Sequence, residues 1–304
     1  MSGGALVLTY HRIASGRDPQ LQCVDPVRFA EQLDVLRTTC AVVPLAELDD
    51  DAHGRRVAIT FDDGYADNAL AAAPLLRDAQ MPATFFVPSR ILEDASEFWW
   101  DRLEHAHLDA GASDVVVVDV APAGRRLRVD VRSEAGRLRS LKALNRRLRP
   151  LALDDVDAAV AAVQKQLGVH SEPRCHAHAL LDEGLLRPLA SDPLFEVGSH
   201  GATHVMLGFR SPAEQREELE RSRASLERAT GRTVTSLAYP YGIPGSYGEE
   251  TVRLAREAGY VRAYANTPGR TERRRDRFRR PRHMVYDWGG EDFAARLRQW
   301  WAQA

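Results

Sequence analysis

Two adjacent aspartates end an apolar stretch in "VAITFDDGYADN", residues 57–68. The apolar run before Asp62 and Asp63 is typical of a buried strand, and successive strand side chains face opposite sides. In α/β proteins, ligands bind at the carboxyl ends of the strands, and Gly64 would let the chain turn sharply there. Either aspartate could instead cap a helix that begins near Ala66. The pair alone therefore leaves a chemical role and a capping role open.

Two histidines, His200 and His204, follow a second strand-like stretch in "EVGSHGATHVML". On a helical turn, a spacing of four places both imidazoles on one face, which is the arrangement that paired histidines need to bind a metal. One carboxylate would complete a set of two histidines and one acid, with positions left for water and substrate. Two polar histidines on a loop could have the same spacing. The motif therefore indicates a metal site only in combination with the aspartate pair.

A third strand-like stretch ends in "LAYPYG", residues 237–242. Tyr239 and Tyr241 flank a proline, so aromatic side chains and a rigid stretch of backbone would lie at the same edge of a sheet. Tyr239 and Tyr65, which follows the glycine of the first motif, are the candidate substrate-binding side chains. The same pattern also occurs in simple turns.

Strand-like and helix-like segments alternate over most of the chain. Apolar runs at residues 5–10, 56–61, 83–87, 194–200, 235–242 and 260–266 are separated by amphipathic segments. One of these segments has a capping serine at Ser211, Glu214 at the capping-box position and a terminating Gly231, which predicts a helix. Near-continuous apolar strands that alternate with helices predict an α/β fold, with a parallel sheet covered on both faces or closed into a barrel.

The stretch from 98 to 190 interrupts this alternation. It contains "SDVVVVDV" and "RRLRVDV", which are typical of a hairpin, followed by arginine- and alanine-rich helical segments. We therefore expect a mainly helical insertion at 98–190 within one catalytic domain of residues 1–304.

The composition argues against several classes of protein. A net charge of −2 argues against a nucleic-acid partner, and no apolar run is long enough for a membrane-spanning helix. The three cysteines, Cys23, Cys40 and Cys175, are too few and too widely spaced for a disulfide framework or a cysteine metal site. The N-terminus has neither a basic region nor a small-residue cleavage site, so we expect a cytoplasmic protein. The oligomeric state stays open.

The blocks "TFDDG", "SHGATH" and "AYPYG", in this order at three strand ends, resemble the signature blocks of polysaccharide deacetylases, carbohydrate esterase family 4 with the NodB homology domain. The resemblance covers residues 5–92 and about 190–286. It implies a distorted (β/α)7-type barrel that hydrolyses N-acetyl groups of amino sugars with one divalent metal, usually Zn²⁺, with Co²⁺ or Ni²⁺ as alternatives. The implied substrate is a carbohydrate: a polysaccharide, a lipid-linked sugar or a small glycoconjugate.

Matched block by block, the resemblance implies a role for each motif residue. Asp62 would be the general base, and Asp63, His200 and His204 the metal ligands. The backbone N–H of Tyr241 would stabilise the oxyanion. A metal in such a site polarises the acetyl carbonyl and lowers the pKa of water.

Two positions depart from the common pattern of the family. The C-terminal histidine block that carries the general acid in many members is not found. "LTYHRI", residues 8–13, is similar to the first strand of circularly permuted members, which suggests His11 as the acid, with His283 in "RPRHMV" as the competitor. Tyr239 occupies the place of an arginine that orients the base in many members. Arg282 is expected to supply that guanidinium, unless it lies on the surface.

Two other functions remain open at this stage. Some relatives in the same superfamily hydrolyse cyclic amides or imides, and a catalytically inactive homologue could bind carbohydrate without cleaving it. The sequence retains the base and all three ligands, which favours an enzyme over an inactive homologue.

Overall fold

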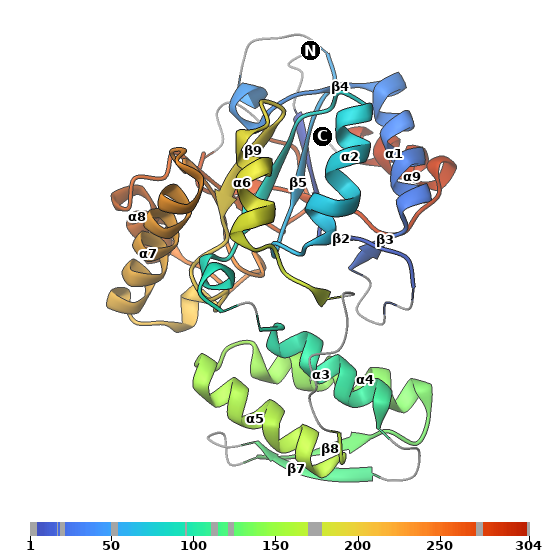
Figure 1. Cartoon of the computed structure of the whole chain (residues 1–304), viewed down its shortest axis with the longest axis vertical. Helices are drawn as coiled ribbons and strands as arrows, with labels where there is room; N and C mark the ends of the chain where they lie inside the picture. Colours follow the sequence, from blue (N-terminus) through green and yellow to red (C-terminus); the bar gives the residue numbers. More distant parts are fainter. Residues whose placement is uncertain are drawn as a thin grey trace. The chain divides into compact units, whose positions relative to one another are not determined.

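The computed structural model of the chain describes residues 5–16, 18, 22–49, 54–94, 96–110, 115–120, 125–169, 178–271 and 276–302. The chain divides into two compact units. The first, called the barrel unit, comprises Met1–Ala95 and Leu180–Ala304, and the second, called the inserted unit, is Ser96–Ala179. Figure 1 colours both along the sequence.

A parallel sheet of nine strands forms the centre of the barrel unit. The strands are β1 (Ala5–Tyr10), β4 (Ala41–Val42), β5 (Arg56–Phe61), β6 (Ala83–Val87), β9 (Phe195–Ser199), β10 (Ser236–Ala238), β11 (Arg262–Ala265), β12 (Arg280–Pro281) and β13 (His283–Met284). Their order is β12-β11-β10-β9-β6-β5-β1-β13, with β4 beside β5. Every residue of β1 and β5 is buried, which explains their continuous apolar sequences.

The sheet closes on itself through Arg282. The outermost strands, β12 and β13, are consecutive in the sequence with Arg282 alone between them. Pro281 pairs with Ala265 of β11, and His283 pairs with Leu8 of β1. The two short strands therefore act as one interrupted strand that bridges β11 and β1, which leaves seven strands around the ring. This confirms the distorted (β/α)7-type barrel that the resemblance implies.

Helices surround these strands (Figure 1). They are α1 (Pro26–Thr39), α2 (Ala73–Asp78), α6 (Glu183–Ser191), α7 (Pro212–Thr230), α8 (Glu249–Glu257) and α9 (Gly290–Ala302). Single helical turns span Leu45–Asp49, Asn68–Ala72, Ser89–Leu92 and Leu207–Phe209, and a small separate sheet pairs β2 (Arg12–Ile13) with β3 (Cys23–Val24). The capping box expected at Ser211 is present, and α7 ends at Gly231 with φ of 67°, as the sequence predicts.

A row of aromatic rings fixes which way the strand ends face. Tyr10, Phe61 and Phe85 are paired across β1, β5 and β6, and their stacked ring centroids lie 5.4 Å and 5.0 Å apart. Phe29 of α1 contacts the first two rings, so the row faces the helix layer. Because strand side chains alternate, the residue after Phe61, Asp62, is directed to the other side, toward the interior of the barrel.

The inserted unit consists of α3 (Trp99–Asp109), a hairpin of β7 (Val115–Val120) and β8 (Arg125–Asp130), α4 (Glu134–Leu148) and α5 (Leu153–Gln166). The antiparallel register from Val115↔Asp130 to Val120↔Arg125 confirms the expected hairpin. The boundary differs from the expected 98–190, because α6 packs on β9 and α7 and so belongs to the barrel unit.

Two composition-based expectations bear on the described residues. None of the described helices is both long and apolar enough to cross a membrane. Cys23 and Cys40 are not joined in a disulfide, and Cys175 lies outside the described part of the chain.

Candidate active site

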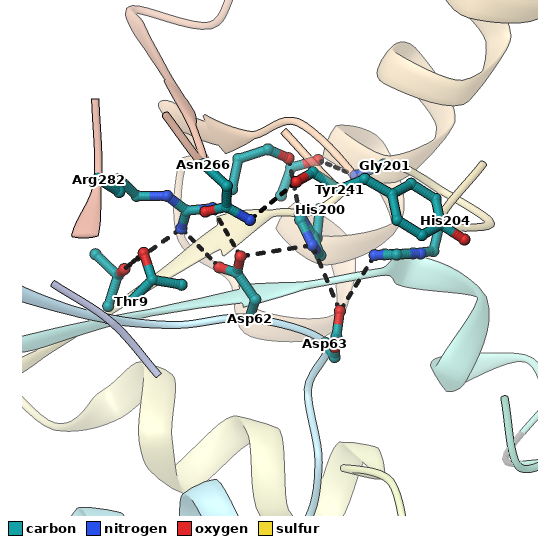
Figure 2. Close-up of polar contacts among 12 residues, drawn as sticks. Thr9, Asp62, Asp63, His200, Gly201, His204, Tyr241, Asn266 and Arg282 are labelled. Carbon is teal, nitrogen blue, oxygen red and sulfur yellow. Dashed lines mark hydrogen bonds and ion pairs between the residues drawn. The ribbon is translucent and has the colours of Figure 1, made fainter. Parts of the chain in front are cut away.

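The candidate residues of the three motifs gather at the carboxyl ends of the barrel strands, where parallel α/β barrels place their active sites. His11 follows β1, Asp62 and Asp63 follow β5, His200 follows β9, Tyr239 and Tyr241 follow β10, and Arg282 follows β12. Figure 2 shows Asp62 between Arg282 and His200, and Asp63 between His200 and His204. Segments far apart in the sequence therefore converge as the motifs predict.

Asp63, His200 and His204 form a group that can hold a metal ion. Asp63 Oδ1 lies 3.5 Å from His200 Nε2 and 3.2 Å from His204 Nε2, and one ligand atom from each residue lies within 4.8 Å of the others. All three residues are buried. Their spacing predicts a helical turn, but the two histidines lie on a loop. The backbone of this loop adopts left-handed conformations at Gly201 (φ 75°) and His204 (φ 61°).

A backbone contact sets the orientation of His200. Its Nδ1 lies 2.8 Å from the carbonyl oxygen of Ala238, so Nδ1 carries the proton and donates to that oxygen. Nε2 then faces Asp63, and in the neutral ring it carries the lone pair that a metal ion would bind. Such a partner on the second ring nitrogen is typical of metal-binding histidines. Two imidazole nitrogens and one carboxylate are a donor set that suits zinc and related divalent transition metals, so these residues fit the metal that the resemblance implies.

Arg282 binds Asp62 through both of its terminal nitrogens. The Nη1–Oδ1 and Nη2–Oδ2 distances are both 2.7 Å, and neither side chain is exposed to solvent. This two-point contact confirms the expectation that Arg282 reaches the aspartate. The arginine is held there because it lies between the two short strands that close the barrel.

The charges of the site oppose the effect of burial on the two carboxyl groups. Burial alone would raise the pKa of Asp62, but the Arg282 guanidinium and, more weakly, His200 hold that pKa below its usual value. Burial likewise acts to raise the pKa of Asp63, and hydrogen bonds from His200 and His204 hold it well below the usual range. Both carboxyl groups are therefore ionised at neutral pH.

The two histidines respond differently to the same surroundings. Burial disfavours the charged form of each ring. For His200, the charges of Asp62 and Asp63 outweigh burial and raise the pKa. For His204, burial prevails over the hydrogen bond to Asp63 and lowers the pKa. His204 is thus held neutral, the form in which imidazole binds a metal.

Glu218 of α7 supports the loop that carries the histidines. Its Oε2 accepts hydrogen bonds from the backbone N–H groups of Ala202 (3.0 Å) and Thr203 (2.9 Å), and its Oε1 accepts from Thr203 Oγ1 at 2.7 Å. The motifs do not reveal this residue. The available signal is an acid on the buried face of the helix, beside Leu219 and Ser222.

Backbone conformation at the site is unusual. The described non-glycine residues with positive φ are Asp63 (73°), Gln80 (55°), His204 (61°) and Tyr241 (63°), and three of these four lie in the site. Such conformations persist where surrounding contacts enforce them, and they cluster at functional positions.

Tyr241 is held in its left-handed conformation by contacts on two sides. Its carbonyl oxygen accepts a hydrogen bond from Asn266 Nδ2 at 3.0 Å. Its ring packs on that of His204, with centroids 4.7 Å apart. Asn266 was not found by the motifs, although a polar residue directly after β11 is a usable signal.

His11 and His283, the two candidate acids, lie in different surroundings. His11 is buried, its backbone oxygen accepts from Asn68 Nδ2 at 2.8 Å, and its charge adds to the influences that lower the pKa values of both aspartates. The His283 ring lies 3.0 Å from the carbonyl oxygen of Gly269 and stacks on Trp300, with centroids 4.4 Å apart. It faces away from Arg282, its neighbour in the chain, as strand alternation requires.

The two tyrosines predicted to bind substrate are fully buried. The Tyr239 hydroxyl donates to the carbonyl oxygen of Phe278 at 3.0 Å, and its ring stacks on Tyr247 with centroids 4.1 Å apart. Tyr65 packs beneath the guanidinium of Arg12, 5.0 Å from the ring centroid. Both side chains pack within the fold, and their contact with a substrate stays a prediction.

The chain is similar to known proteins both in sequence pattern and in fold. A family model described as polysaccharide deacetylase matches residues 49–111 and 144–263. No protein with a curated description gives a significant match.

Several solved structures are similar. One is IcaB from Ammonifex degensii, with 19% identity, coverage of 99% of this chain and 98% of that chain, and a TM-score of 0.60. Another is the Streptococcus pyogenes deacetylase PplD in complex with acetate, with 15% identity, coverage of 98% of both chains and a TM-score of 0.59. A polysaccharide deacetylase from Bacillus cereus has 18% identity and a TM-score of 0.59, and the match covers 96% of this chain and 68% of that one. At these identities the likeness concerns the fold.

Proposed function

Because this chain belongs to the polysaccharide deacetylase family, we propose that it is a metal-dependent enzyme that removes the acetyl group from an N-acetylated amino sugar. As a member of that family it is a hydrolase that acts on N-acetyl amide bonds of a carbohydrate. The metal, the sugar and the residue roles are the parts that we propose here.

The observation that carries the proposal is that two neighbouring carboxylates have different partners. Asp63 faces His200 and His204, whereas Asp62 is bound by Arg282. Asp63, His200 and His204 would hold the metal, which, when bound, polarises the acetyl carbonyl and lowers the pKa of water. Asp62 is ionised and is not needed as a ligand, so it is available to accept a proton.

The other roles follow from positions around this centre. Asp62 would take the proton from the attacking water as general base, and Arg282 keeps its carboxylate oriented. The backbone N–H of Tyr241 would donate to the oxyanion that forms on the acetyl group. His11 would give a proton to the departing amine, because it follows β1 at the strand ends that carry the aspartates, whereas the His283 ring is held by Gly269 and Trp300.

Acetate release from N-acetylglucosamine oligosaccharides, before and after chelation, tests the proposal. We expect activity to disappear with a chelator and to return with Zn²⁺, Co²⁺ or Ni²⁺. Asp62→Asn should lower kcat by about 10²–10⁴-fold, the usual contribution of a general base. Asp192→Asn, which alters a carboxylate paired with Arg77 in the same unit, is the matched control.

Two outcomes would reject the proposal. Full activity in Asp62→Asn together with no metal dependence would exclude the mechanism. Turnover of cyclic amides or imides in place of acetylated sugars would assign the site to the other hydrolase class considered from the sequence.

A further inference from the structure

A second group of metal-ligating side chains lies outside the barrel, in the inserted unit. It comprises Glu97, just before α3, His105 within α3, and His178 near the end of the unit. One ligand atom from each lies within 4.8 Å of the others. His105 contacts both neighbours: its Nδ1 is 3.3 Å from Glu97 Oε2, and its Nε2 is 2.9 Å from His178 Nδ1.

The two imidazole rings of this group are arranged like the pair in the barrel. The centroids of His105 and His178 are 4.7 Å apart with an interplanar angle of 61°. For His200 and His204 the corresponding values are 4.7 Å and 65°. Asp63 contacts both rings of the barrel pair, whereas Glu97 contacts His105, which in turn contacts His178; both groups still offer two imidazole nitrogens and one acidic oxygen.

A second carboxylate lies behind one of the rings. Asp101 Oδ1 is 3.8 Å from His178 Nε2, and its side chain is 2% exposed. If His178 binds an ion through Nδ1, its other ring nitrogen faces this acid, which is the arrangement that orients metal-binding histidines in many sites. Asp101 and His105 are four residues apart on α3, so one helix supplies both the ligand and the orienting acid.

The start of α3 is held in place by aromatic packing, which keeps these groups together. Phe98 and Trp100 are buried, and their rings stack with centroids 4.3 Å apart. Trp99 packs edge-on against Trp100 at 5.5 Å. The ligands themselves are only partly covered: the side chains of Glu97, His105 and His178 are 15%, 18% and 10% exposed. An ion could therefore enter from solvent and keep a water in its remaining position.

We propose that Glu97, His105 and His178 form a Zn²⁺ site that stabilises the inserted unit. Two nitrogens and one carboxylate oxygen favour zinc over calcium or magnesium, which prefer oxygen ligands alone. The site is structural: Glu97 and His178 are the second and the second-last residues of Ser96–Ala179, so one ion would link the two ends of the unit.

This arrangement predicts how the ion acts. His105 and His178 are 73 positions apart, so an ion that binds both restricts a long stretch of the unfolded chain. Like other ligands of the native state, it raises the unfolding temperature, and the rise grows with the logarithm of the free ion concentration once that exceeds Kd. The inference does not depend on the proposed hydrolase function, because neither the ligands nor the effect involve the barrel.

Counting the ions bound by full-length variants tests the proposal. The double variant His200→Ala/His204→Ala removes the barrel ligands. We expect it to retain one Zn²⁺ per chain and to unfold at a higher temperature with Zn²⁺ than after chelation. Adding His105→Gln and His178→Gln should abolish both the bound ion and the shift in unfolding temperature. His107→Gln, which alters another histidine of α3, is the matched control and should retain the ion.

A spectroscopic measurement keeps the test valid if the quadruple variant does not fold. Co²⁺ added to His200→Ala/His204→Ala should give visible absorption bands from a site with nitrogen ligands, and Glu97→Gln should weaken the Co²⁺ affinity more than tenfold. A folded His200→Ala/His204→Ala chain that binds neither Zn²⁺ nor Co²⁺ overturns the proposal. In that case the three side chains form only a hydrogen-bonded network. Because activity is not measured, this outcome is distinct from failure of the hydrolase proposal.

Discussion

At the scale of single residues, the pair of Arg282 and Asp62 determines the charge state of the proposed base. Both side chains are completely buried, and the guanidinium also lies 5.5 Å from the ring centroid of Phe86. Arg282 is therefore the main charge that compensates Asp62, with a weaker contribution from His200. Removal of one partner leaves a buried charge without compensation, which is more costly than loss of a surface ion pair.

Replacement of Arg282 by methionine should affect both stability and pH dependence. We expect a loss of about 3–5 kcal/mol in the free energy of unfolding, measured by urea denaturation. Burial still raises the pKa of Asp62 while its strongest opposing charge is gone, so the acid limb of the kcat/KM profile should move to higher pH. Arg216→Met, which alters an exposed arginine paired with Glu220 and Glu257, should change neither quantity measurably. An acid limb that does not move would contradict the assigned pairing.

His283 predicts a separate dependence of stability on pH. Burial lowers its pKa in the folded state, whereas the unfolded chain titrates near about 6.5. Below that pH the unfolded state binds more protons, so the free energy of unfolding decreases as the pH falls. His283→Phe keeps the packing on Trp300 and removes the titration. Urea denaturation at pH 8 and pH 5 should show a smaller decrease for the variant, and equal decreases would refute the assignment.

The sequence predicts well which residues lie at the ends of the strands. It predicts less well which way their side chains face. Strand-end placement suffices to bring Asp63 near His200. It does not determine which way the ring of Tyr239 faces, because one position along a strand separates the interior of the barrel from the helix layer. Asn266 was missed because its amide acts through the backbone of Tyr241, a contact that no spacing encodes.

At the scale of elements, loops at the strand ends depend on the helices behind them. The segment between His200 and His204 has no regular structure, and its backbone N–H groups are bound by Glu218 from α7. The predicted helix at 211–231 matches α7 closely because its caps are local signals. The expected end of the insertion, residue 190, lies beyond the end of the inserted unit at Ala179. The amphipathic pattern of α6 does not reveal which unit the helix packs on.

Glu218→Gln tests the dependence of the loop on α7. The amide keeps the shape of the side chain but replaces one accepting oxygen with a donor, so it cannot satisfy all three donors of Ala202 and Thr203. We expect the Zn²⁺ concentration needed for half-maximal reactivation to rise by about 10–100-fold, the usual effect of losing a partner of the ligand shell. Glu220→Gln lies on the exposed face of the same helix and should leave it unchanged. Equal values for both variants would exclude a positioning role.

At the scale of the whole molecule, one compact unit interrupts another. The proposed base, its arginine and the three barrel ligands all belong to the barrel unit. Glu97 and His178, each one residue from an end of the inserted unit, have ligand atoms within 4.8 Å of each other. Such closely spaced ends are typical of insertions that a surrounding fold tolerates.

Replacement of Ser96–Ala179 by a short glycine-serine linker should therefore leave a folded barrel. We expect native-like circular dichroism and one bound Zn²⁺ per shortened chain, measured by elemental analysis. Asp62→Asn in the shortened chain should retain the ion, which separates metal binding from catalysis. A shortened chain without cooperative unfolding would show that the barrel needs the insertion to fold.

Closure of the ring by β12 and β13 has a consequence for biosynthesis. The arginine that neutralises Asp62 lies 220 positions further along the chain, and at about 5–20 residues per second the ribosome needs roughly 10–40 s to reach it. Throughout that interval β1 is an edge strand that can pair with other nascent chains, and β11 becomes a second edge only shortly before Arg282 is made. The newly made polypeptide should therefore depend on chaperones until its last strands emerge from the exit tunnel.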